Sequence, residues 1–181
     1  MSDGTPASDT ITAIATARGE SALAIVRLSG PDAVAIAARC FRPVDLNTVD
    51  THTAHVGTAH RDGLALDQVV ATVFKAPRTA TGEDIVEITT HGGDYAPQLV
   101  LAALVASGAR PAEAGEFTQR AFLNGKLDLA QAEAVADLIH ASSQMAHRAS
   151  LGRVQGRYSD VLSGARQELL DLTGLVELEL D

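Results

Sequence analysis

The hydrophobic pattern of this chain changes character at Asp128, and that change constrains the fold more than any other feature. Before Asp128, short apolar runs alternate with turn-forming residues and with helical patterns. From Asp128 onward the strand patterns stop, and two long helical patterns fill the rest of the sequence. The sequence therefore predicts a mixed domain followed by helices.

The first part carries the patterns of several strands and two helices. Short apolar runs predict strands at 11–15, 22–28, 52–60, 68–74 and 85–90. The Asp62-Gly63 pair between the third and fourth runs is typical of a β-hairpin turn. Helical spacing predicts helices at 31–41 and 95–107, and Gly108 suits the left-handed residue that ends many helices. Strands and helices that intermingle in this way favour an α+β domain.

The second part predicts long helices. Asp128 with Gln131 resembles a capping box that opens the first helix. In the second, apolar residues from Leu151 to Val176 recur every three or four positions. A helix of about thirty residues, roughly 45 Å long, cannot bury such a stripe against one shorter neighbour. We therefore expect further helices, either from a larger bundle or from other subunits.

Composition and charge limit the classes of function. With 14 basic and 23 acidic residues the formal net charge is −9, so a large electropositive surface for nucleic acid is not expected. The single cysteine, Cys40, excludes an intramolecular disulfide and a multi-cysteine zinc site. Neither a signal peptide pattern nor an apolar run of membrane-spanning length is present, so we expect a cytoplasmic protein with no membrane span. Small polar residues at 1–9 predict a disordered tail.

Two apparent ligand motifs fail on closer inspection. His52, His55 and His60 suggest a metal site, but in a strand positions 52 and 55 point to opposite faces, and no carboxylate stands at ligand spacing. The Gly125-Lys126 pair looks like the end of a phosphate loop. However, Arg120 and Leu127 occupy the positions where that loop requires Gly and Ser or Thr. We therefore predict neither a metal site nor a nucleotide phosphate site.

The densest local signal is the run GEFTQRAFLNGKLDLAQAEA at 115–134. This run resembles the tRNA-modification GTPase family called MnmE or TrmE, in which GEF, RAFLN, K and DLAQAEA recur in this order. Three further segments are similar to the same family, namely 9–30, the TGEDIVE segment at 81–87, and His91-Gly92-Gly93. These matches fall in family order and extend over essentially the whole chain, so the resemblance is far more specific than any one short motif.

The resemblance implies an aminomethyltransferase-like domain at 10–124 that binds tetrahydrofolate and dimerises, followed by part of a helical domain at 125–181. It also implies that Arg27, Glu87 and Lys126 bind the folate. A carboxylate can accept paired hydrogen bonds from a pterin ring, while a guanidinium and an ammonium can donate to carbonyl or carboxylate oxygens. Without the resemblance, each of the three would be interpreted as an ordinary solvent-facing charge.

The resemblance further implies 5-formyl-tetrahydrofolate or 5,10-methylenetetrahydrofolate as the cofactor, a homodimer through the N-terminal domain, and a flavin-dependent partner subunit. The whole protein would modify the wobble uridine of tRNA, with tRNA contacting this chain only indirectly. GTP, Mg and K would bind a G domain that this sequence lacks, as it lacks the family's C-terminal cysteine motif. We therefore assign no catalytic residue here and expect no GTP hydrolysis by this chain alone.

Several features have two interpretations. Gly92 and Gly93 could let the backbone approach a ligand or bind an anion, or could simply form a tight turn. His91 could be an acid-base group or a structural histidine beside the same site. Glu116 and Arg120 stand at helical pairing distance, and we interpret them as architectural. The alternatives for the whole chain are a dimerisation platform with a vestigial folate pocket, or a free-standing aminomethyltransferase-like enzyme.

Overall fold

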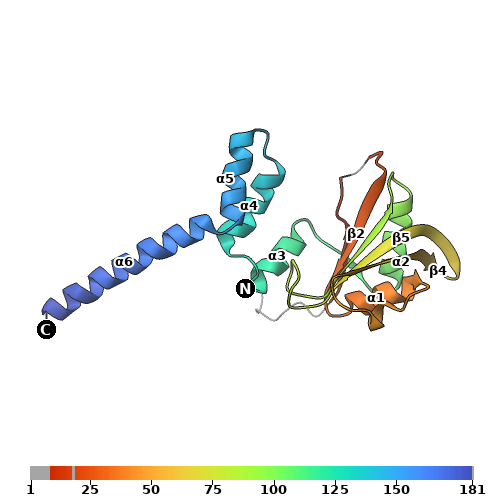
Figure 1. The fold of residues 1–181 in the computed structure, drawn as a ribbon, viewed down its shortest axis with the longest axis horizontal. Coiled ribbons are helices and arrows are strands. Elements are labelled where there is room, and N and C mark those ends of the chain that lie inside the picture. Colours follow the sequence, from red (N-terminus) through yellow and green to blue (C-terminus); the bar gives the residue numbers. More distant parts are fainter. Residues whose placement is uncertain (1–8, 18, 181) are drawn as a thin grey trace. The chain divides into compact units, whose positions relative to one another are not determined.

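A computed structural model describes residues 9–17 and 19–180, with side chains described as far as residue 177 (Figure 1). The expected tail at 1–9 therefore lies outside the described residues except for Asp9. The chain divides into two compact units, one reaching Lys126 and the other starting at Leu127. The domain boundary expected from the sequence lay two residues earlier. Each unit is described by itself below.

The described part of the first unit contains a seven-stranded sheet with four short helical segments. The strands are β1 (Ile11–Ile14), β2 (Leu23–Ser29), β3 (Phe41–Arg42), β4 (Thr53–Arg61), β5 (Leu64–Phe74), β6 (Ile85–His91) and β7 (Arg110–Pro111). The helices are α1 (Ala33–Cys40), the 3-10 turn η1 (Leu46–Thr48), α2 (Ala96–Ala106) and α3 (Glu116–Leu123). Neighbours follow the order β3-β4-β5-β6-β2-β1-β7, antiparallel except for the parallel pair of β1 and β7.

This arrangement confirms the predicted mixture of strands and helices. The hairpin of β4 and β5 turns at Asp62 and Gly63, both with positive φ, as the Asp-Gly signal predicted. Gly108 has a φ of 116° just after α2, where the sequence placed a helix end. Strand β5 begins at Leu64, four residues before the predicted strand, so the hairpin is longer than the sequence indicated.

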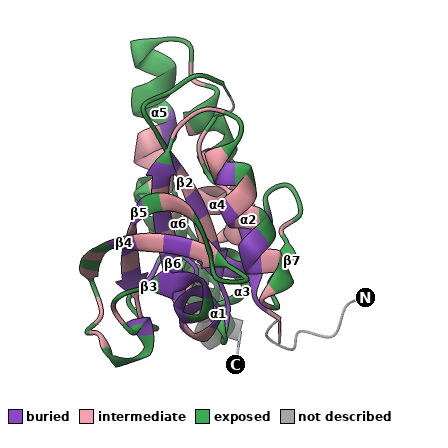
Figure 2. Ribbon diagram, turned by 90° about the vertical axis from the view of Figure 1, so that its right-hand side faces the viewer, coloured by how far each residue is buried: buried purple, intermediate pink, exposed green. Residues whose placement is uncertain are grey.

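The core lies between one face of the sheet and helices α1 and α2. Alternate residues of the central strands, among them Val26, Val73 and Val86, are fully buried together with side chains from both helices. Buried residues gather where α1 meets the sheet (Figure 2). At Gly57 a side chain would collide with the Phe41 ring, since an added Cβ would lie 2.4 Å from Phe41 Cζ. Helices α1 and α2 leave the opposite face of the sheet uncovered.

A cluster of ion pairs fixes α3 beside the start of β1. Arg120 is only 3% exposed, and its Nη2 donates to Glu116 Oε1 at 3.0 Å and to Asp9 Oδ1 at 2.7 Å. Arg110 donates to the same two carboxylates. Hydrogen bonding from Arg110, more than any other contact, lowers the pKa of Glu116 to about 2. The predicted pairing of Glu116 with Arg120 is confirmed, whereas Asp9 belongs to this cluster and not to a disordered tail.

The second unit contains three helices in its described residues, α4 (Leu129–Ile139), α5 (Gln144–Val154) and α6 (Arg157–Leu180). The capping box is confirmed, because Asp128 accepts from the Gln131 backbone and the Gln131 side chain accepts from the Asp128 backbone. The single long helix predicted from Leu151 to Val176 is wrong. Gly156, with a φ of 82°, ends α5 and separates it from α6. The apolar periodicity continues across this break, which is why the pattern concealed it.

No helix within the described residues is both long enough and apolar enough to span a membrane.

Candidate functional site

Arg27 and Glu87 meet on the face of the sheet that α1 and α2 leave uncovered. They occupy directly paired positions of the antiparallel strands β2 and β6. Their flanking residues Val26, Leu28 and Val86 are fully buried on the helical side, so strand alternation turns both charged side chains to the other face. The Arg27 Nε donates to Glu87 Oε1 at 2.9 Å, and Nη2 donates to the same oxygen. Among residues 9–17 and 19–177, no group donates to Oε2 of Glu87, which leaves that oxygen available to a further donor.

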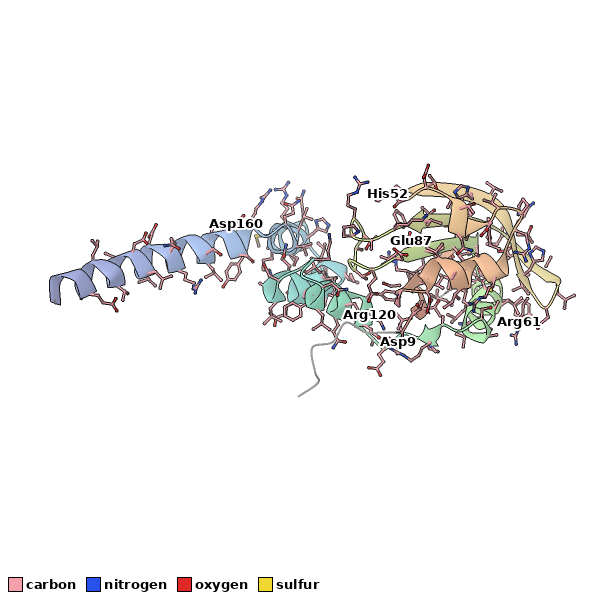
Figure 3. All side chains as sticks on the ribbon, turned by 90° about the horizontal axis from the view of Figure 1, so that it is seen from below. Asp9, His52, Arg61, Glu87, Arg120 and Asp160 are labelled. Atoms are coloured by element: carbon pink, nitrogen blue, oxygen red, sulfur yellow. The ribbon has the colours of Figure 1, made fainter. Side chains whose placement is uncertain are left out.

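A hollow of about 260 Å³ lies beside Glu87. Its lining comes from β5, β6, the segment between them and the residue before β4, and comprises His52, Phe74, Arg78, Thr79, Ala80, Ile85 and Glu87. The His52 ring meets Phe74 edge to face, with centroids 5.4 Å apart. The sequence placed His52 within a strand, but it precedes β4 with a φ of 62°. His52 and Glu87, which both line the hollow, are labelled in Figure 3. The hollow thus combines a carboxylate, an aromatic wall and a guanidinium.

A second aromatic ring contacts the paired arginine. The Arg27 guanidinium carbon lies 5.7 Å from the ring centroid of Phe117, a residue of α3. Such contacts are favourable because the face of the ring carries partial negative charge. Helix α3, held by the buried Arg120 cluster, therefore helps to position Arg27.

Lys126 lies next to the segment that borders the hollow. Its Nζ donates to the Pro77 carbonyl oxygen at 3.2 Å, and Pro77 directly precedes the lining residues Arg78 and Thr79. The backbone of Gly82 also packs against the lysine, since a Cβ added there would lie 3.3 Å from Lys126 Cγ. The structure thus joins Arg27 to Glu87 directly and places the Lys126 ammonium on the Pro77 carbonyl, one residue before the lining of the adjoining hollow.

His91 makes a well-defined pair that the sequence did not indicate. Its Nδ1 lies 2.6 Å from Asp67 Oδ1, and its backbone N–H donates to Asp67 Oδ2 at 2.8 Å. The imidazole is 68% exposed, whereas Asp67 is 10% exposed. A carboxylate inside a mostly apolar strand was the signal that could have revealed Asp67. His91 lines a separate hollow of about 270 Å³, which Glu87 does not line.

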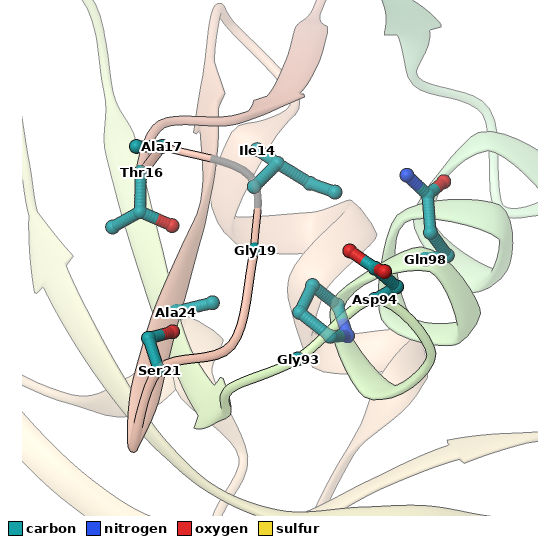
Figure 4. A pocket seen from close by; sticks show the side chains of 10 residues that line it. Ile14, Thr16, Ala17, Gly19, Ser21, Ala24, Gly93, Asp94 and Gln98 are labelled. Carbon is teal, nitrogen blue, oxygen red and sulfur yellow. The ribbon is translucent and has the colours of Figure 1, made fainter.

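Gly92 and Gly93 serve the fold in two different ways. The Gly92 N–H donates to the Ala22 carbonyl at 3.0 Å, and a Cβ at Gly92 would lie 1.9 Å from the Ser21 carbonyl oxygen. Its amide is therefore already used, and close backbone packing explains the glycine. Gly93 has a φ of 85° and lines a hollow of about 510 Å³ next to Asp94 and the first turn of α2 (Figure 4). This hollow shares no lining residue with the one at Glu87.

Sequence reasoning missed three side chains around the Arg27 and Glu87 pair. Phe74 is the last residue of β5, Arg78 lies in the irregular segment after it, and Phe117 belongs to α3. Phe74 carried one usable signal, because it falls at the end of an alternating strand in register with Ile85. The position of the other two depends on tertiary packing.

Two family descriptions match the chain. The family described as GTP-binding protein TrmE N-terminus matches residues 10–126, and the MnmE helical domain matches residues 129–181. The two matches meet where the structure divides into its two units.

Curated relatives agree with these matches. The protein named tRNA modification GTPase MnmE from Salinibacter ruber is 63% identical over 175 residues, which is 96% of this chain and 38% of that protein. Proteins of the same name from Cytophaga hutchinsonii and Streptococcus thermophilus are 47% and 48% identical, each over 173 residues, with the same coverage. The chain spans 38% of the length of these relatives. Because a family description covers well over half of it, the chain belongs to the MnmE family of tRNA modification GTPases and matches that family's N-terminal and helical regions.

Proposed function

We propose that this chain binds a tetrahydrofolate one-carbon donor at the hollow beside Glu87, with Arg27 and Lys126 as further binding residues. The observation that carries the proposal is the direct pairing of Arg27 with Glu87 through one carboxylate oxygen, at the edge of a hollow with an aromatic wall. The hydrogen bonds from Arg27 orient the Glu87 carboxylate, and no other described group donates to its Oε2, so that oxygen can accept from a ligand. A partly buried, pre-oriented carboxylate of this kind is suited to recognition and not merely to solubility.

The residues present fit the chemistry of a reduced pterin. One edge of a pterin carries N–H groups, and Oε2 of Glu87 can accept a hydrogen bond from them. Phe74 offers a flat apolar surface to the ring system, and the Lys126 ammonium can donate to a ligand oxygen. When bound, 5-formyl-tetrahydrofolate or 5,10-methylenetetrahydrofolate supplies one carbon. The chain's own residues bind and orient that molecule.

In the whole protein, this site would serve modification of the tRNA wobble position. With a flavin-dependent partner, the protein would form a 5-carboxymethylaminomethyl-type uridine. GTP, with Mg and K, would bind a separate G domain, and the N-terminal domain would form a homodimer in the cytoplasm. Because tRNA phosphates are bound by basic surfaces and this chain has a formal net charge of −9, another component would bind the tRNA.

Titration calorimetry tests the folate site. We expect 5-formyl-tetrahydrofolate to bind the purified chain and to lose at least about tenfold in affinity in Glu87→Ala, because hydrogen bonds to a charged group each contribute about 1.5–3 kcal/mol. Glu133→Ala, which removes an exposed glutamate of α4, is the matched control and should bind like the parent chain. Equal affinity in Glu87→Ala and the parent would refute the assignment of Glu87.

The second candidate is a dimerisation platform whose folate pocket is vestigial. Leu23 and Val56 favour it, because they are 60% and 74% exposed on strands of the sheet and could be covered by a second copy. A chain that dimerises in analytical ultracentrifugation and gives no heat with 5-formyl-tetrahydrofolate would support the platform. Dimerisation together with folate binding would support the folate site.

A further inference from the structure

The basic side chains around the hollow at Glu87 differ in how their charge is used. Arg27 is neutralised by Glu87, and Lys126 donates to a backbone carbonyl. Arg78 is exposed and lines the hollow, and no carboxylate lies within ion-pair distance of it among the described residues. Asp84, an acidic residue of the same connecting segment, accepts from the Ala76 backbone N–H at 2.7 Å. Arg78 is therefore an exposed cation at the hollow with no ion-pair partner in the part of the chain that the structure describes.

The hollow is too small for a whole folate, so part of the ligand would lie near the Arg78 guanidinium. At about 260 Å³ it holds a ring system, but not the whole of a folate with its aminobenzoyl and glutamyl groups. The remainder of such a ligand must extend out of the hollow, past the exposed side chains of its lining. Arg78 and His52 are the exposed polar side chains there. The glutamyl group carries two carboxylates, which a chain with a net charge of −9 would otherwise repel.

We propose that Arg78 binds the glutamyl carboxylates of the folate, and that the site thereby distinguishes folates from pterins that lack this group. This inference rests on the proposed folate site and adds the residue that recognises the anionic end of the ligand. A guanidinium suits the task because its N–H groups can donate in pairs to one carboxylate. Arg27 is less suited to this role, since its Nε and Nη2 already donate to Glu87 and that carboxylate offsets its charge.

The test compares two ligands that differ only in the glutamyl group. These are 5-formyl-tetrahydrofolate and 5-formyl-tetrahydropteroate, titrated by calorimetry into the parent chain and into Arg78→Gln and Arg78→Lys. We expect the parent to prefer the folate by about five- to tenfold, a value below that of a buried charged hydrogen bond because Arg78 is exposed. Arg78→Gln should remove this preference by weakening the folate alone. Arg78→Lys should retain part of it.

Arg61→Gln is the matched control, because it removes another exposed arginine from the β4 and β5 hairpin that lines a different hollow. It should leave the preference for the folate unchanged. Raising the ionic strength should reduce the preference in the parent but not in Arg78→Gln.

The outcomes separate this inference from the proposed function. If neither ligand binds the parent chain, the folate site itself is refuted. If both bind with equal affinity, or if Arg78→Gln weakens both to the same degree, the folate site stands and the role of Arg78 is overturned.

Discussion

Arg27 and Glu87, sixty positions apart in the sequence, are direct neighbours across β2 and β6 and share hydrogen bonds through a single carboxylate oxygen. The antiparallel register alone brings them together, because opposed side chains of paired strands lie about 5 Å apart. The pair is positioned by the most regular part of the sheet. A site built on such strands is held more rigidly than one built on loops.

Replacing Arg27 should harm ligand binding much more than folding. In Arg27→Gln, Glu87 loses its orienting partner, so we expect the affinity for 5-formyl-tetrahydrofolate to fall by about tenfold or more. Stability should fall by only about 0.2–1 kcal/mol, since both side chains are partly exposed and cross-strand pairs contribute that much. Calorimetry and urea denaturation measure the two effects. A large loss of stability with unchanged affinity would show that the pair is structural.

The sequence predicted the regular elements well because their determinants are local. Alternating apolar residues, the Asp62-Gly63 turn and the Asp128 capping box each act within a few positions, and all three are present. The break at Gly156 was missed because the apolar stripe keeps its period on both sides of the glycine. Periodicity records which face is apolar, but it does not record a change in the direction of the axis.

The site was predictable only in part. Family motifs indicated Arg27, Glu87 and Lys126, and the structure shows two of them in contact and the third at the border of the same hollow. Arg78 and Phe117 could not be found in the same way, because no local pattern links an exposed arginine or a helical phenylalanine to a strand far away in the sequence. Asp67, paired with His91, depends similarly on the register between β5 and β6.

Arg120 should be among the most sensitive positions of the first unit. Its guanidinium is 3% exposed and bonds Asp9, Glu83 and Glu116. In Arg120→Met, three carboxylates would lose a buried partner, and breaking a buried ion pair from one side costs about 3–5 kcal/mol. Urea denaturation of the first unit measures the loss. Arg61→Met, at an exposed hairpin position, should change stability by no more than about 0.5 kcal/mol.

Acid should destabilise the first unit through the same cluster. Hydrogen bonding from Arg110 is the largest influence on Glu116 and holds its pKa at about 2, below the usual value of 4.5. The unfolded chain therefore takes up the proton first as the pH falls, so the stabilisation is complete above about pH 4.5 and disappears towards pH 2. The pKa of Asp9 is lowered in the same direction, chiefly by Arg110.

Glu116→Gln isolates this contribution. The variant should be less stable than the parent at pH 7 by about 1–3 kcal/mol, because the arginines lose a charged acceptor. It should also lose less stability between pH 4.5 and pH 2, so the two proteins should converge in acid. Urea midpoints measured across this range provide the comparison. Parallel curves that do not converge would contradict the role assigned to Glu116.

Helix α6 should open more readily than the sheet of the first unit. Leu169, Leu172 and Val176 follow one helical stripe and are 65%, 59% and 57% exposed, so little apolar burial stabilises this segment. Backbone amides of residues 162–177 should therefore exchange with solvent by local opening, whereas those of β2 and β6 should exchange only through global unfolding. Hydrogen exchange followed by mass spectrometry measures both on one sample. If the amides of α6 were as protected as those of the central strands in a proven monomer, the exposed stripe would not govern the stability of the helix. If protection rose with protein concentration, self-association through these apolar side chains would be the cause.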